Sequence, residues 1–157
     1  MFDRILVPLD GSELAECILP YVEELTRDKK MKEVILFRVC ERPEISADYP
    51  ASMPESWEQH VKDIMTGAQE QCSLYLGGIE KKLSNSGVKI RVECCLGKAA
   101  DEIVKFAEKN QVDLIIMASH GRSGISRWTI GSVAEKVFRS TCVPVLLIRA
   151  PGCVTGF

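Results

Sequence analysis

The sequence predicts a single α/β domain, built as an open parallel five-stranded sheet with helices on both faces. Short apolar runs alternate along the chain with stretches whose apolar residues recur every three or four positions, which is the pattern of strands alternating with helices. The segments between strands are long enough for the helical crossovers that parallel pairing requires. A chain of 157 residues, 46% of them hydrophobic, can form one compact core but not two comfortable domains.

The first strand and helix lie near the N-terminus. Residues 4–10 form an apolar run that stops at Gly11-Ser12, a junction that typically ends a strand and caps a helix. The apolar residues at positions 15, 18, 19 and 22 then share one face of a helix. We expect this to be one helix running to about residue 27.

The second strand and a long helix follow. Residues 33–40 are almost continuously apolar, as in a strand of a parallel sheet that is buried on both faces. A polar segment with three prolines separates them from residues 57–83, where apolar residues are spaced by three or four throughout. This spacing predicts a long amphipathic helix, although Gly67 and Gly77-Gly78 argue against its continuity.

The second half of the chain completes the alternation. Its elements are a strand at 88–96, a helix with its apolar face over 100–107 and its end at Asn110, a strand at 113–119, a short helix at 132–140 and a strand at 144–149. Five strands thus alternate with four helices, and no internal repeat is present. In such a doubly wound sheet a ligand binds at the carboxyl ends of the strands, where the winding reverses.

Charge and the first residues exclude several classes of protein. The net charge of -2 gives no global basic field, so wholesale binding to nucleic acid or to an anionic membrane is not expected, and any anion site must be local. The N-terminus lacks a basic-then-apolar secretion signal, and no apolar stretch approaches the roughly 18 residues of a membrane span. We therefore expect a soluble cytoplasmic protein.

The seven cysteines form an odd set without C-x-x-C spacing. Most of them lie in apolar runs, where a free thiol packs as a small hydrophobe. Redox sensing is the alternative role. Cys94-Cys95 would face opposite sides of a strand and so make a poor pair of metal ligands, and we predict no metal site.

Residues 117–136, MASHGRSGISRWTIGSVAEK, carry the strongest sign of a ligand site. The S-x-x-E pattern from Ser132 to Glu135 predicts a capping box, with the helix beginning directly after Gly131. Unsatisfied N–H groups and the helix dipole attract a phosphate or carboxylate there. The glycines at 121, 124 and 131 present bare backbone, while His120, Arg122 and Arg127 supply positive charge. The alternative is an ordinary β-to-α connection, in which Ser132 only caps its helix and the arginines are solvated.

The same residues resemble the universal stress protein family. Its nucleotide-binding members carry G-x-x-G, nine residues and then G-(S/T), and residues 118–132 match this pattern except that Ala118 replaces the first glycine. Further similar stretches are residues 5–12, 97–103, 113–124 and 143–149. The resemblance therefore covers nearly the whole chain, with a domain at 1–150 and a loose tail at 151–157.

The resemblance implies a site for ATP, with or without magnesium. Asp10 would contact the ribose, the backbone at Val39 and Met117 would lie near the adenine, and Pro8 would stiffen the strand end before Asp10. The residues around ribose and phosphates would be Ala118, Gly121, Gly131, Ser132 and Val133, joined by the charges of His120 and Arg122. The methyl group of Ala118 either obstructs close approach of the ligand or demands a different φ there.

The sequence does not predict a true enzyme. It contains no G-x-x-x-x-G-K-[ST] and no G-x-S-x-G motif, and its two histidines lie in different segments. Slow ATP turnover is the most we expect, in a sensor whose nucleotide state biases its shape or its choice of partner. A transferase or hydrolase acting through Ser119-His120 or Asp10 is a remote alternative, because no nucleophile, base and orienting group occur together.

The last strand indicates a second role. The family's strand order, 3-2-1-4-5, places residues 145–149 at a sheet edge, and the resemblance implies antiparallel pairing with a second copy in a two-fold dimer. The alternative is a dimeric interaction protein that does not bind ATP because its pocket is altered at Ala118. An ordinary solvated edge is the other possibility, which the apolar character of this strand disfavours.

Overall fold

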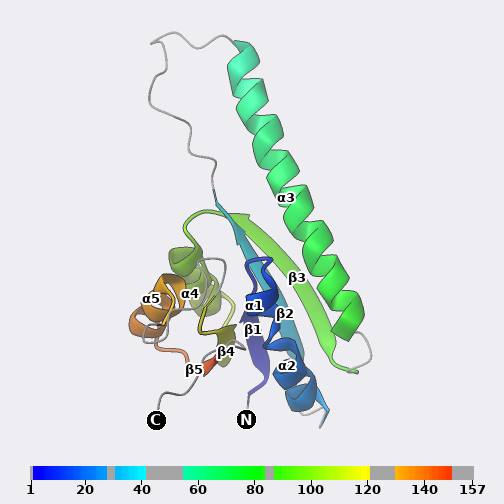
Figure 1. The fold of residues 1–157 in the computed structure, drawn as a ribbon, viewed down its shortest axis with the longest axis vertical. Coiled ribbons are helices and arrows are strands. Elements are labelled where there is room, and N and C mark those ends of the chain that lie inside the picture. The colour runs from blue at the N-terminus through cyan, green and yellow to red at the C-terminus, as the bar shows by residue number, and fades with distance from the viewer. Residues whose placement is uncertain (1, 28–30, 42–54, 84–86, 121–129, 150–157) are drawn as a thin grey trace.

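A computed structural model describes residues 2–27, 31–41, 55–83, 87–120 and 130–149 of the chain (Figure 1). The proline-bearing segment, Gly121, Arg122, Gly124, Arg127 and the predicted tail lie outside these described residues, so the expectations for them stay predictions. In the described part no helix is long and apolar enough to cross a membrane.

The strands form one parallel sheet in the order β3-β2-β1-β4-β5, which confirms the predicted architecture. Their bounds are β1 Arg4–Pro8, β2 Glu33–Cys40, β3 Lys89–Leu96, β4 Leu114–Ala118 and β5 Val145–Ile148. The register runs from Arg4 opposite Glu33 to Pro8 opposite Phe37 between β1 and β2. The winding reverses between β1 and β4, so the carboxyl ends of these two strands define the place where a ligand is expected.

Helices cover both faces of the sheet, as predicted. Their bounds are α1 Glu13–Glu16, α2 Leu19–Thr26, α3 Glu55–Leu83, α4 Ala99–Lys109 and α5 Ser132–Ser140. One buried cluster joins the sheet to α1, α2 and α3, and a second joins its other face to α4 and α5. In the second cluster Phe37 of β2 stacks on Phe106 of α4, with ring centroids 4.4 Å apart.

The prediction of one helix after β1 is wrong, because the segment contains two. The chain leaves α1 at Cys17 and begins α2 with Leu19, which places Pro20 in the first turn of the second helix. Proline is tolerated there, but inside a continuous helix its ring would clash with the carbonyl group of Glu16, four residues earlier. The apolar face at positions 15, 18, 19 and 22 is nevertheless buried, as expected.

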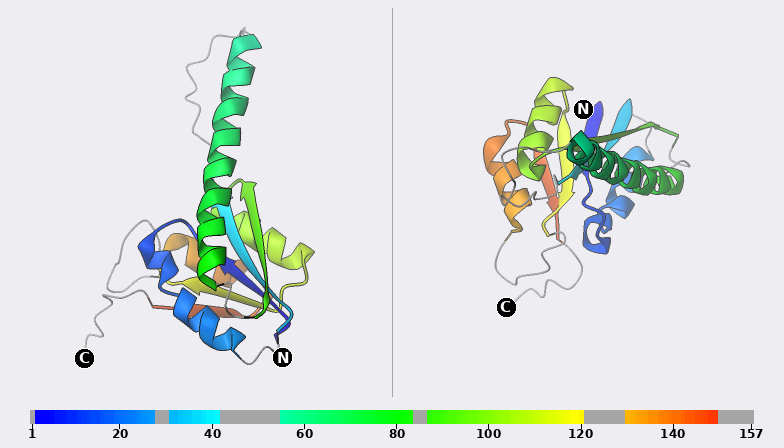
Figure 2. Two further views of the ribbon diagram at one scale, coloured as in Figure 1. Left: turned by 90° about the vertical axis from the view of Figure 1, so that its right-hand side faces the viewer. Right: turned by 90° about the horizontal axis from the view of Figure 1, so that it is seen from above.

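Helix α3 is continuous across its three glycines, as the spacing of its apolar residues predicts. A methyl group on Gly67, Gly77 or Gly78 would contact nothing within 4 Å, so packing does not require these glycines. The helix has 29 residues and is therefore about 44 Å long, whereas the eight residues of β2 or β3 span about 26 Å. Figures 1 and 2 show the N-terminal half of α3 projecting past the sheet.

The amino ends of the strands are joined by a buried carboxylate. Glu33 is only 6% exposed, and its carboxylate pairs with Lys89 Nζ at 2.7 Å, Arg91 at 3.6 Å and Arg4 at 3.7 Å. The Arg91 guanidinium also lies over the Phe106 ring, 5.7 Å from its centroid. This network holds β1, β2 and β3 together at the end of the sheet opposite to the expected ligand.

The expectation of free thiols is wrong for two of the cysteines. Cys40, at the end of β2, and Cys72 of α3 form a disulfide with a Cα–Cα distance of 6.8 Å. The pairing could not be inferred from spacing, because the two residues are 32 positions apart and only the fold brings α3 against β2. Cys94 and Cys95 do face opposite sides of the sheet, as expected.

The four free cysteines in the described part should react unequally with an alkylating reagent. Cys142 is exposed, whereas burial, aided by Glu102, raises the pKa of the Cys95 thiol to about 11. At pH 8 only about one Cys95 in a thousand is the reactive thiolate. We expect brief iodoacetamide treatment to label Cys142 first and Cys95 last by peptide mass spectrometry. Early labelling of Cys95 would contradict its burial.

Candidate functional site

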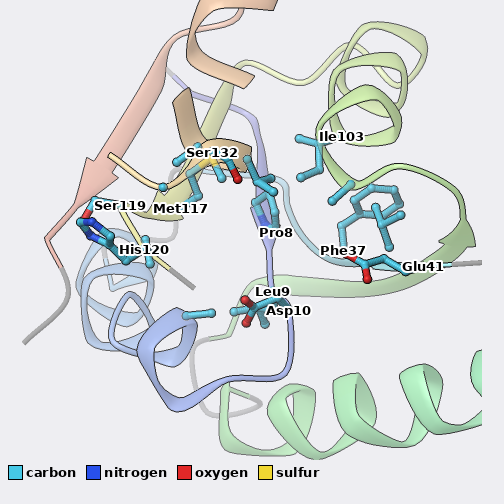
Figure 3. A pocket seen from close by; sticks show the side chains of 17 residues that line it. Pro8, Leu9, Asp10, Phe37, Glu41, Ile103, Met117, Ser119, His120 and Ser132 are labelled. Carbon is cyan, nitrogen blue, oxygen red and sulfur yellow. The ribbon is translucent and has the colours of Figure 1, made fainter. Parts of the chain in front are cut away.

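A cavity of about 240 Å³ lies at the carboxyl ends of β1 and β4, where the winding reverses (Figure 3). Side chains from β1, β2, α4, β4 and α5 line it. Phe37, Val39, Ile103 and Met117 form largely apolar walls, while Asp10 and Ser132 supply polar groups. The position agrees with the rule for open α/β sheets, and the combination of apolar walls with a few polar groups is typical of small-molecule sites.

The structure brings together nine of the eleven residues that the sequence predicts for the site. These are Pro8, Asp10, Val39, Met117, Ala118, His120, Gly131, Ser132 and Val133, all of which line the cavity. Gly121 and Arg122 lie outside the described residues. Sequence reasoning missed Phe37 and Ile103, although a signal was present: Phe37 lies two residues before Val39 and so faces the same side of β2.

The turn after β1 fixes Asp10 at one end of the cavity. Oδ1 of Asp10 accepts hydrogen bonds from the Ser12 backbone N–H at 2.9 Å and from the Ser12 hydroxyl at 2.6 Å. The Ser12 hydroxyl oxygen in turn accepts the Ala15 N–H at 3.1 Å and caps α1. Gly11 between them has a φ of +86°, a conformation that favours glycine. Asp10 therefore has a defined orientation before any ligand arrives.

Helix α5 begins at Ser132, as predicted, but the predicted capping box is wrong. The N-cap is Gly131, and no side chain caps the helix. The Gly131 N–H donates to the Ser119 carbonyl oxygen at 2.7 Å, which holds Gly131 just outside the helix and makes Ser132 its first residue. A capping box needs serine one position earlier. The Gly131 amide is thus used within the protein, while the N–H groups of the first turn have no intrahelical acceptor.

Ala118 ends β4 in ordinary strand conformation. In the described residues Gln111 is the only non-glycine residue with a positive φ, so Ala118 has a backbone conformation that any residue can adopt. Its side chain is 7% exposed and belongs to the buried cluster with α1 and α2. The alanine is accommodated by the strand without strain.

Ser119 and His120 form a pair at the edge of the cavity. The Ser119 hydroxyl lies 3.0 Å from His120 Nδ1, and both residues are buried. Figure 3 shows the two side chains together, with Phe37 and Glu41 at the opposite end of the view. Nε2 of His120 has no hydrogen-bond partner within the described part of the chain. The pair therefore lacks, among these residues, the third group that orients a catalytic histidine.

A comparison with protein families identifies the chain. The model of the universal stress protein family matches residues 1–149. The chain belongs to the universal stress protein family. This assignment confirms the resemblance carried by the glycine pattern, and the match extends through all five strands of the sheet.

Individual members of the family agree with this assignment. This chain is 33% identical over 156 residues to universal stress protein MJ0577 of Methanocaldococcus jannaschii. The match covers 95% of this chain and 96% of the relative. MJ0531 of the same organism is 31% identical over 151 residues, covering 96% and 84%. The solved structure of MJ0577 superimposes with a TM-score of 0.83 over 97% of this universal stress protein and 99% of that chain.

More distant universal stress proteins share the fold. A solved structure from Arabidopsis thaliana, described with AMP bound, has a TM-score of 0.61 at 15% identity, over 95% of this chain and 92% of that one. Another, described as a complex with cAMP, has a TM-score of 0.58 at 17% identity, over 95% and 98%. At such low identity these structures speak for the fold alone.

Proposed function

We propose that this universal stress protein binds an adenine nucleotide, ATP, in the cavity after β4 and acts as a dimeric stress-response or signalling module. The observation that carries the proposal is the meeting of three features at one place: apolar walls, the fixed carboxylate of Asp10 and the N-terminus of α5. An adenine base packs against apolar walls, the hydroxyl groups of a ribose donate hydrogen bonds to a carboxylate, and phosphates bind at the N-terminus of a helix.

The base and the ribose would occupy the cavity itself. Phe37, Val39, Ile103 and Met117 offer the apolar surface on which an adenine ring packs, and backbone groups at Val39 and Met117 would recognise its edge. Asp10 would accept hydrogen bonds from the ribose hydroxyls. The cavity of about 240 Å³ is slightly smaller than the ~300–1,000 Å³ typical of small-molecule sites, so a nucleoside would fill it and the phosphates would lie at its rim.

The phosphates would be held at the start of α5. The first-turn N–H groups of Ser132 and Val133 and the positive end of the helix dipole favour an anion, and the Ser132 hydroxyl adds a donor. The net charge of -2 means that the attraction must be local. His120 and the arginines after it remain predicted contributors. Structures described with AMP and with cAMP indicate that a protein of this fold can hold a nucleotide.

Titration calorimetry with ATP, ADP and AMP, each with and without Mg²⁺, tests the proposal. We expect saturable binding of ATP, with GTP as the control for recognition of the base. No heat at millimolar ATP would overturn it and favour the alternative, an interaction module whose pocket Ala118 has altered. We predict at most slow hydrolysis. Rapid multiple-turnover hydrolysis would revive a role for Ser119 and His120 in catalysis.

The edge of the sheet supports dimer formation. β5 is the last strand in the order and pairs with β4, so its other edge has backbone groups that a second strand can bind. Leu146 on this strand is 38% exposed. We propose that Val145–Arg149 pairs with its copy in a second chain, which gives a symmetric dimer.

Replacement of Leu146 by aspartate is expected to convert the dimer into a monomer. Position 146 is one residue from the centre of the proposed pairing, so the two carboxylates would be diagonal neighbours close to the symmetry axis, and their repulsion and desolvation oppose pairing. Light scattering coupled to size exclusion measures the change. Leu74→Asp is the matched control, because Leu74 of α3 is 77% exposed. Helix α3 packs on β2 and β3, on the opposite side of the sheet from β5. A wild-type protein that is already monomeric would overturn the proposal.

A further inference from the structure

The turn at Gly11 packs against the guanidinium group of Arg38, which also stacks on an aromatic ring. A Cβ atom on Gly11 would lie 2.8 Å from a guanidinium nitrogen of Arg38 and 2.9 Å from its Cζ. On its other side, Arg38 Cζ lies 4.8 Å from the centroid of the Tyr75 ring. The guanidinium group is thus packed between the turn that follows β1 and helix α3. Arginine is suited to this position because its charged group is planar and stacks on aromatic rings.

The ring that supports Arg38 is itself fixed. The Tyr75 hydroxyl donates to Glu16 Oε1 at 3.1 Å, and Lys82 Nζ pairs with Glu16 Oε2 at 3.1 Å. Burial and the neighbouring Glu16 carboxylate raise the pKa of the Tyr75 phenol above its usual range, so it stays a donor at neutral pH. The charges of Arg38 and Asp10 both act on this phenol as well.

Arg38 does not line the cavity, but its neighbours do. Val39, the next residue of β2, and Asp10, next to the contacted Gly11, are both lining residues. Since Arg38 alternates with Val39 along the strand, its side chain lies on the α3 face of the sheet. It therefore does not contact a ligand in the cavity, and it influences the ligand's position through the residues that it supports.

We propose that Arg38, backed by Tyr75, is a positioning residue that sets the orientation of Asp10 and so determines how strongly the site selects a ribose over a deoxyribose. The inference rests on the proposed function, in which Asp10 receives the ribose hydroxyls. Without the guanidinium group, the planar contact beneath Gly11 would be lost. The turn would then relax, and the Asp10 carboxylate, still bonded to Ser12, would shift with the turn relative to the cavity.

The readout is the ratio of the affinities for ATP and for its 2′-deoxy and 3′-deoxy analogues, measured by calorimetry. A change that only destabilises the protein weakens all three ligands alike and leaves the ratios unchanged. Loss of a hydroxyl that meets a positioned carboxylate costs the wild type about tenfold or more in affinity, equal to roughly 1.4 kcal/mol. We expect Arg38→Met, which keeps the length but not the charge or plane, to reduce this ratio to within about threefold. Tyr75→Leu is expected to reduce it similarly.

Arg91→Met provides a matched control. Arg91 also lies over an aromatic ring, Phe106, and is ion-paired, but it is at the amino end of the sheet. Its replacement is expected to lower the melting temperature and leave the ratio as in the wild type. A wild-type ratio in Arg38→Met, or no discrimination by the wild type when ATP binds, would overturn the inference alone. No binding of ATP by the wild type would overturn the proposed function, and the inference with it.

Discussion

Replacement of Gly131 by valine is expected to weaken ATP binding by about a hundredfold or more, equal to roughly 2.7 kcal/mol. A Cβ atom at this position would lie 3.0 Å from the Ser119 carbonyl oxygen and 3.5 Å from the His120 Cα. Both neighbours are backbone atoms that cannot rotate away, so the start of α5 must shift relative to β4. The branched side chain would also stand beside the first-turn N–H groups. Calorimetry with ATP measures the loss.

The control separates this effect from the general cost of an added side chain. Gly131→Ala and Gly78→Ala each add a single Cβ atom, but the one at Gly78 would contact nothing within 4 Å. Gly78→Ala should bind ATP as the wild type does and should be slightly more stable, because alanine favours a helix over glycine. Gly131→Ala should bind distinctly more weakly. Equal affinities of these two variants for ATP would contradict a role of the α5 N-terminus in binding it.

Reduction of the Cys40–Cys72 disulfide is expected to lower the free energy of unfolding by about 3–4 kcal/mol on the chain-entropy model. The bond closes a loop across 32 residues of sequence separation, so it restricts the unfolded chain considerably. It also fastens α3 to the end of β2, beside the cavity. Urea denaturation with and without dithiothreitol measures the difference, provided that unfolding is two-state.

Two variants make the disulfide test specific. Cys72→Ser should be less stable than the wild type and indifferent to dithiothreitol. Cys142→Ser should respond to dithiothreitol as the wild type does, since Cys142 is a free, exposed cysteine. Identical urea midpoints for oxidised and reduced wild type would contradict the expected stabilisation. Disulfides are rare in the reducing cytosol, so this bond argues against the cytoplasmic location that the sequence predicts.

Patterns of hydrophobicity were sufficient to predict a parallel, doubly wound α/β sheet, and the family resemblance supplied its strand order. A strand buried on both faces is a continuous apolar run, and the apolar residues of α3 keep their helical spacing despite its glycines. Both β2 and α3 therefore lie within a few residues of their predicted bounds. Local rules failed where a single proline or a neighbouring strand decided the outcome. Pro20 divides the first helix, and the carbonyl group of Ser119 makes Gly131 rather than Ser132 the cap of α5.

Only those residues of the candidate site that belong to local sequence motifs could be predicted. Residues that follow β1 and β4 could be assigned because motifs surround them, and the fold does place them on one cavity. Contacts between distant segments have no signature in a single sequence. The stacking of Arg38 on Tyr75 and the disulfide from Cys40 to Cys72 depend on how α3 lies on the sheet, which only the three-dimensional arrangement decides.

The length of α3 has a consequence for its dynamics. Its C-terminal half buries Cys72, Leu76, Ile79 and Leu83 in the core, whereas the half that projects past the strands relies on local contacts such as the bond from Gln59 to Asp63. An isolated helical stretch of this kind is marginally stable in water. Amide hydrogen exchange along α3 should therefore follow a gradient, with the outer turns opening by fraying and the inner turns only in rarer cooperative events.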